Sequence, residues 1–220
     1  MTNGNDRKLE RLNSGLPDTL SANTYNLVIG GCLLYGFLLN ALIVWLCGDF
    51  FQEMNYIVFL IGYFVLAFAG IIISTKSQNP LISFIGYNLV VVPIGAVLSV
   101  CLPGYAFKEI LLAIIITGAV VGFMTVLAST KPELFSKMGL SLGIALIAGI
   151  VGELIAMLLG YAGNIFNWLF VIIFTLYIGY DWHKAQMYPK TLDNAVDSAL
   201  DLYLDIINLF IRLLDIIKRD

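Results

Sequence analysis

The sequence predicts an all-α integral membrane protein with seven transmembrane helices. Of its 220 residues, 60% are hydrophobic and 12% are charged, whereas soluble domains carry about 25% charged residues. Apolar runs long enough to cross a bilayer follow one another with short connections. The net charge of -3 offers no basic patch, so nucleic acid is not an expected partner.

The chain divides into a polar tail and one membrane domain. Residues 1–23 are predicted to form a cytoplasmic polar tail, and residues 24–220 a seven-helix transmembrane domain. No apolar core with a small-residue cleavage site precedes the first span, so the start of the chain does not resemble a secretory signal peptide. The expected surroundings are therefore membrane lipid on the outside of a single helical domain.

Six apolar runs of spanning length come first. They cover residues 25–47, 56–74, 81–102, 107–129, 138–159 and 165–181. Pro93 lies near the middle of the third run, where it predicts a kink. Short connections, such as 48–55 and 160–164, make neighbouring helices antiparallel.

The seventh run, residues 194–220, is apolar and yet rich in acids. At about 100° per residue its polar side chains fall within roughly a quarter turn of one helix: Asp197, Asp201, Asp205, Asn208, Arg212 and Asp215. A charge that faces lipid at mid-membrane costs about 2.5 kcal/mol or more. We therefore expect the rest of the chain to surround this helix.

Lysine and arginine in the short loops predict the orientation. Basic residues lie in the amino-terminal tail and in the loops after the second, fourth and sixth spans, whereas the other side carries only Lys108, at the start of the fourth span. The positive-inside rule then places the amino terminus in the cytoplasm. Seven full spans put Lys218 and Arg219 outside, against that rule, so a re-entrant last helix stays an alternative.

Two aspartates near the cytoplasmic side form the first candidate site. Asp181 ends the sixth span within YIGYDWHKAQ, and Asp205 lies two to three turns into the seventh. The antiparallel turn brings both carboxylates to the same half of the bundle, where a close pair would share a proton. The prediction is a proton-dependent latch between Asp181 and Asp205. The alternative makes Asp181 an interfacial acid near Lys184.

An acidic ladder leads along the last helix. Asp197, Asp201 and Asp205 are four residues apart, and like charges at this spacing destabilise a helix. Carboxylates are also the ligands that hard cations such as calcium prefer. The ladder therefore predicts a cation entry, with the alternative that Asp197 and Asp201 simply stand in cytoplasmic water.

A third constellation lies toward the outer side. Glu153 lies well inside the fifth span, and Arg212 lies at a comparable depth in the seventh. They are predicted to form an intramembrane ion pair. Its role is either a structural bridge or a second gate or ion site.

The end of the chain resembles a known family. Two segments, YIGYDWHKAQ and SALDLYLDIINLFIRLL, are similar to the end of Bax inhibitor-1 family proteins. Asp205, the second aspartate of the second segment, follows Asp181 of the first by 24 residues. The resemblance implies a bacterial-type member in the cytoplasmic membrane, with the last helix inside a ring of the other six. It also implies a pH-sensitive calcium leak, with Asp181 and Asp205 matching the family's paired aspartates and contacting calcium.

Some bacterial relatives also carry an acid in the second span and an arginine at its cytoplasmic end. Here residues 56–74 contain no acid and only Lys76 follows, so those two roles are not carried over.

Three functions remain in competition. The leading one is a calcium or cation leak channel that needs no cofactor and is not an enzyme, with calcium and protons as its ions. An intramembrane aspartyl protease is the alternative, because Tyr180 and Asp181 match one of its motifs; however, Leu202, Tyr203 and Leu204 replace the glycine motif expected before the second aspartate. A non-conducting regulator or scaffold of membrane protein partners is the third.

Overall fold

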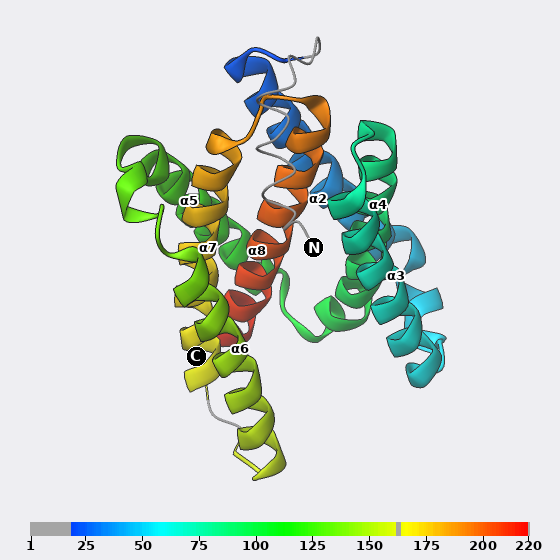
Figure 1. Ribbon diagram of the computed structural model, residues 1–220. Coiled ribbons are helices and arrows are strands. Elements are labelled where there is room, and N and C mark those ends of the chain that lie inside the picture. Colours follow the sequence, from blue (N-terminus) through cyan, green and yellow to red (C-terminus); the bar gives the residue numbers. More distant parts are fainter. Residues whose placement is uncertain (1–18, 162–163, 220) are drawn as a thin grey trace. The chain divides into compact units, whose positions relative to one another are not determined.

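The computed structural model describes residues 19–161 and 164–219, and it is helical over nearly all of them (Figure 1). The expected polar tail lies mostly outside these residues. Six helices in the described part of the chain are long and apolar enough to cross a membrane. The seventh, α8, is not among those six, and it carries acids at four-residue intervals. The protein is thus an all-α membrane protein, while the central place of α8 within a ring of six stays a prediction.

The helices follow the predicted runs closely. Their bounds are α2 Ala22–Glu53, α3 Tyr56–Lys76, α4 Pro80–Cys101, α5 Phe107–Thr130, α6 Gly139–Leu158, α7 Ile165–Met187 and α8 Leu192–Arg219. Short 3-10 turns at Leu102–Gly104 and Pro132–Leu134 follow α4 and α5. Helix α4 continues through Pro93.

Two helices extend beyond the predicted apolar runs, and one of them makes the predicted connection 48–55 too long. The expected connection 48–55 is mostly helix, because α2 continues to Glu53. The next helix, α3, begins after Asn55, whose side chain accepts a hydrogen bond from the backbone N–H of Ile57 at 3.0 Å. Helix α7 likewise continues beyond Asp181 to Met187. The polar residues that follow Asp181 are compatible with a helix, and no proline occurs after Asp181 until Pro189.

The chain forms two compact units, and α8 contributes to both of them. The first comprises residues 19–104 and Tyr188–Leu200. In it α4 packs against both α2 and α3. The α3–α4 contact is backbone to backbone, because a Cβ on Gly86 would lie 2.7 Å from the Gly70 carbonyl oxygen and from the Ser74 nitrogen. Small residues allow this close approach of membrane helices.

The second unit comprises residues 105–187, apart from 162–163, and residues 201–219. In it α7 packs against both α5 and α6. The Trp182 indole N–H donates to the Ser129 hydroxyl at 2.8 Å and ties α7 to the end of α5. Gly139 at the start of α6 lies against the Tyr180 ring, where a larger side chain would clash.

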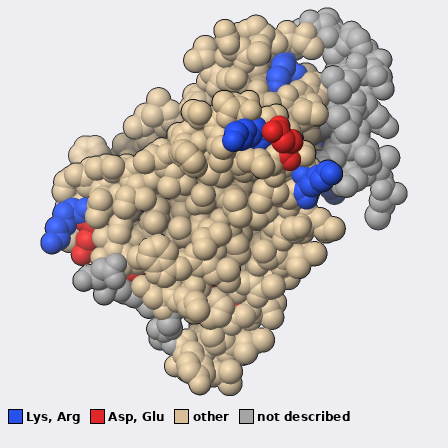
Figure 2. All heavy atoms as spheres, turned by 90° about the vertical axis from the view of Figure 1, so that its left-hand side faces the viewer, with Lys and Arg blue, Asp and Glu red and all other residues tan. Residues whose placement is uncertain are grey.

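Burial separates α8 from the other helices. The six apolar helices expose large hydrophobic side chains, such as Trp45 and Leu158, whereas Tyr203 and Leu209 of α8 are fully buried. Figure 2 shows a face of the molecule dominated by uncharged atoms, with lysine, arginine, aspartate and glutamate confined to a few small groups. An apolar exterior of this kind suits lipid, and the polar side chains of α8 contact protein instead.

Candidate functional site

Helix α8 carries four acids at four-residue intervals: Asp193, Asp197, Asp201 and Asp205. This spacing places them along one side of the helix. The first two belong to the first unit, and the last two to the second unit. Each pair therefore has its neighbours within its own unit.

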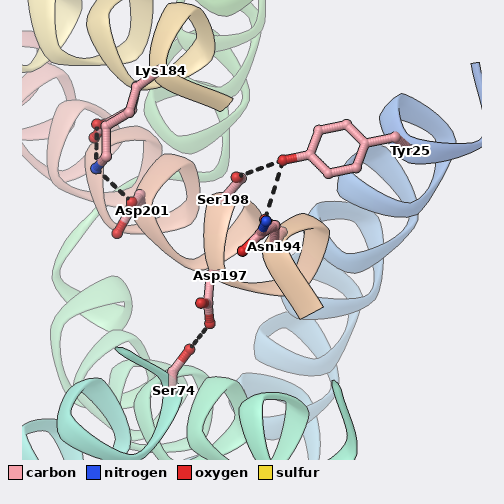
Figure 3. Close-up of polar contacts among 8 residues, drawn as sticks. Tyr25, Ser74, Lys184, Asn194, Asp197, Ser198 and Asp201 are labelled. Atoms are coloured by element: carbon pink, nitrogen blue, oxygen red, sulfur yellow. Dashed lines mark hydrogen bonds and ion pairs between the residues drawn. The ribbon is translucent and has the colours of Figure 1, made fainter. Parts of the chain in front are cut away.

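The first pair is bound by serine hydroxyls. Ser83 of α4 donates to Asp193 at 2.6 Å, and Ser74 of α3 donates to Asp197 at 2.5 Å (Figure 3 shows the second bond). Both aspartates are only 3% exposed. An ionised carboxylate only accepts hydrogen bonds, so both serine hydroxyls stabilise the ionised form of their aspartate. The burial of Asp197 argues against the interpretation that it stands in water.

A tyrosine completes this contact, which we call the α8 anchor (Tyr25, Ser74, Ser83, Asp193, Asp197 and Ser198). The Tyr25 hydroxyl lies 3.0 Å from the Ser198 hydroxyl and donates to the Asn194 carbonyl at 3.2 Å (Figure 3). The Lys190 ammonium lies 4.5 Å from the centre of the Tyr25 ring, and burial lowers the pKa of Lys190. Hydrogen bonds from the hydroxyl groups of Tyr25, Ser74 and Ser83 thus hold the beginning of α8 to α2, α3 and α4.

The second pair faces charged groups on α7. Asp181 and Asp205 are buried neighbours whose carboxyl groups interact with each other, and the two residues are 9% and 7% exposed. Asp205 Oδ2 is buried and accepts no hydrogen bond from a donor in the described part of the chain. Two carboxyl groups in direct contact can form a hydrogen bond only when one of them carries a proton.

Lys184 links this pair to the acidic ladder. Its ammonium lies 3.2 Å from Asp181 Oδ1, one helical turn away. It also lies 2.9 Å from Asp201 Oδ2 on α8 (Figure 3). The Tyr177 side chain faces the same charges. We call Asp181, Lys184, Asp201 and Asp205 the acid cluster. Both sequence interpretations of Asp181 therefore describe real contacts, since it touches Asp205 and also Lys184.

Glu153 and Arg212 form a two-pronged ion pair between α6 and α8. The guanidinium donates to the two Glu153 oxygens at 2.5 and 2.8 Å, and also to Asn167 Oδ1 at 2.9 Å. It lies 4.3 Å from the centre of the Phe170 ring. Planar two-point pairing is the strongest geometry available to arginine. Sequence reasoning anticipated the pair but missed the two partners on α7.

The far end of α8 has another polar contact. The Tyr105 hydroxyl donates to Asp215, and the Lys218 ammonium lies 4.6 Å from the centre of the Tyr105 ring. Asn208 donates back to the Leu204 carbonyl of its own helix at 2.7 Å. These bonds do not connect Asp215 or Asn208 to the acid cluster. The predicted polar arc of α8 therefore serves several separate contacts.

Comparison with known proteins identifies the family. The model of the family described as "Inhibitor of apoptosis-promoting Bax1" matches residues 18–220. The chain belongs to the Bax inhibitor-1 family. A Helicobacter pylori J99 protein described as uncharacterized is 31% identical over 159 residues, which are 70% of this chain and 67% of that protein.

A second relative is "Inner membrane protein YbhL" of Escherichia coli K12. It is 26% identical over 211 residues, covering 88% of this chain and 90% of the relative. The membership and the six apolar helices agree on an integral membrane protein of the Bax inhibitor type. The described residues contain no group of three or more histidine, cysteine, aspartate or glutamate side chains that could hold a metal ion.

Proposed function

We propose that this protein is a pH-sensitive leak channel for cations, with calcium as the favoured ion, in the bacterial cytoplasmic membrane with its amino terminus in the cytoplasm. The observation that carries the proposal is the buried contact between Asp181 of α7 and Asp205 of α8. A proton shared by the two carboxylates holds α8 against α7 and closes the pathway. Loss of the proton leaves two charges that repel and release α8.

The charges of the acid cluster support this latch. Asp181, Asp201 and Asp205 carry three potential negative charges, and Lys184 carries one positive charge. One shared proton leaves a net charge of -1, and its loss leaves -2. Each step makes the cluster more attractive to a hard cation, because carboxylate oxygens are the ligands that calcium prefers.

The proposed entry follows the ladder. Asp197, Asp201 and Asp205 succeed one another at one-turn intervals on α8, so a cation passes from one carboxylate to the next. Asp181 and Asp205 provide its innermost contacts. Calcium is transported here and is not a resident cofactor, so the site needs only weak, successive contacts.

Calcium flux into proteoliposomes over a pH series tests the proposal. Wild-type flux should rise with pH, whereas Asp181→Asn and Asp205→Asn should respond little, because two repelling charges can no longer form. Asp215→Asn is the matched control: it makes the same chemical change on the same helix, at a residue bound to Tyr105. Wild-type pH dependence in both cluster variants would refute the latch.

An intramembrane aspartyl protease is the second candidate, favoured by the same aspartate contact. Two aspartates that share one proton are also the catalytic arrangement of aspartic proteases. Against it, Lys184 pairs with Asp181, and bulky residues precede Asp205 in place of glycines. Cleavage of a model transmembrane substrate that Asp181→Asn abolishes would favour the protease. Wild-type flux no greater than that of empty liposomes, together with co-purifying membrane proteins, would favour a non-conducting regulator.

A further inference from the structure

We infer that the connection between α5 and α6 positions Asp181, and that this aspartate is the fixed half of the proposed latch. The residues that hold it, which we call the α7 clamp, come from the connection and from α7 itself: Ser129, Phe135, Gly139, Gly179, Tyr180 and Trp182. The inference rests on the proposed function, since it concerns how one half of the latch is held.

The first contact is made by Phe135, which lies between α5 and α6 and is only 2% exposed. Its ring lies so close to Gly179 that a Cβ there would overlap the ring carbons. The backbone of Phe135 is fixed as well, because its N–H donates to the Pro132 carbonyl at 3.1 Å and its carbonyl accepts from the Met138 N–H at 3.1 Å. Phe135 is therefore a well-held support for α7.

Two further contacts flank Asp181. The Tyr180 ring lies against Gly139 at the start of α6, where a Cβ would overlap the phenol oxygen. The Trp182 indole N–H donates to the Ser129 hydroxyl at 2.8 Å. The residues immediately before and after Asp181 are thus both held by parts of the chain outside α7.

Helical geometry turns these contacts into a constraint on Asp181. At about 100° per residue, Tyr180 and Trp182 point roughly 100° to either side of it. Gly179 lies on nearly the opposite side of the helix. The α7 clamp therefore holds the other sides of α7 and leaves the side of Asp181 to Asp205, whose carboxyl group interacts with it. A hydrogen bond between two carboxyl groups needs such a defined separation.

The latch and the clamp use different groups. The titratable groups that face Asp181 are two on α8 and two on α7: Asp201, Asp205, Tyr177 and Lys184. No titratable group of α5 or α6 in the described part of the chain acts on it. A change at Phe135 or Gly179 leaves all of these groups in the chain, so it reaches the shared proton through the position of Asp181.

Infrared titration of the protonated carboxyl band in the purified full-length protein tests the inference. Gly179→Ala places a methyl group where the Phe135 ring lies, so it should displace Asp181 and weaken its coupling to Asp205. The band should then disappear about one pH unit below the wild-type midpoint, which is an approximately tenfold weaker hold on the proton. Phe135→Leu lacks the ring carbons that the methyl group meets. The double variant should therefore recover most of the shift.

Two more variants complete the series. Gly118→Ala is the matched control, because it makes the same change in α5 where nothing lies within 4 Å of a Cβ, and it should keep the wild-type midpoint. Ser129→Ala removes the acceptor of the Trp182 indole and should lower the midpoint by about half a pH unit. It serves if Gly179→Ala does not fold.

Calcium flux measured on the same preparations separates the two proposals. A midpoint that Gly179→Ala shifts and Phe135→Leu restores supports the α7 clamp, even if no preparation conducts calcium and the channel is refuted. Flux that depends on pH in the wild type, with unshifted midpoints in Gly179→Ala and Ser129→Ala, refutes the clamp and leaves the channel. A lower melting temperature in these variants without a shifted midpoint would show a purely structural contact and would also overturn the inference.

Discussion

The two halves of α8 use the same residue type at the same spacing for different purposes. Before Leu200, Asp193 and Asp197 accept hydrogen bonds from Ser83 and Ser74. After Leu200, Asp201 contacts Lys184, and Asp205 contacts Asp181. The two aspartates of the first half thus accept hydroxyl hydrogen bonds, and those of the second half contact an ammonium and another carboxyl group.

This difference teaches that the partner, and not the aspartate, decides what a buried acid does. A serine hydroxyl donates whatever the pH, so the α8 anchor keeps its hydrogen bonds as long as the aspartates are ionised. A second carboxylate repels or binds according to one proton. Sensitivity of the closed state to pH should consequently reside in the acid cluster and spare the α8 anchor.

The largest expected effect separates the two halves directly. Asp205→Asn should abolish the pH response of calcium flux, which in the wild type can reach about tenfold per pH unit because one proton is coupled to opening. Asp197→Asn should keep the response, since an amide oxygen still accepts the Ser74 hydrogen bond. Proteoliposome flux at a series of pH values measures both, and equal losses in the two variants would remove the distinction.

The next effect concerns stability alone. Arg212→Met leaves Glu153 without its two-pronged partner and should lower the free energy of unfolding by about 3 kcal/mol. Replacing Glu153 by Met as well should restore most of that loss, because no unpaired charge remains. Denaturation in detergent measures the series. A double variant as unstable as the single one would show that the pair does more than neutralise charge.

Enlarging Gly86, at the contact of α3 with α4, should destabilise the protein somewhat less than Arg212→Met does. A Cβ on Gly86 would meet the backbone of Ser74 and the Gly70 carbonyl, so Gly86→Ala should force α3 and α4 apart and cost about 2 kcal/mol. Gly62→Ala is the control, since nothing lies within 4 Å of a Cβ there. Thermal melting compares the two. If Gly86→Ala melted like the control, the close helix contact would be doubtful.

The smallest effect tests the tyrosine of the α8 anchor. Tyr25→Phe removes the hydroxyl that contacts Ser198 and the Asn194 carbonyl and should cost about 1 kcal/mol. The pH dependence of calcium flux should be unchanged. A shifted pH dependence in this variant would mean that the two halves of α8 are coupled.

Much of this account follows from the sequence, because apolar length and the cost of a charge in lipid are strong constraints. They predict six of the helices within a few residues, the burial of α8, and the encounter of Asp181 with Asp205. The Lys184–Asp181 contact also follows from their separation of one turn. Ser74 and Ser83 could not be found, because a serine in an apolar helix gives no signal of its partner. The Lys184–Asp201 contact could not be predicted either, because it depends on how α7 packs against α8.

Infrared spectroscopy of the protonated carboxyl group tests the shared proton most directly. The wild type should show a protonated carboxyl band that disappears as the pH rises. Asp205→Asn should lack that band, because Asp181 keeps Lys184 as its partner and remains ionised, and Asp197→Asn should retain it. A band that survives in Asp205→Asn would contradict the account.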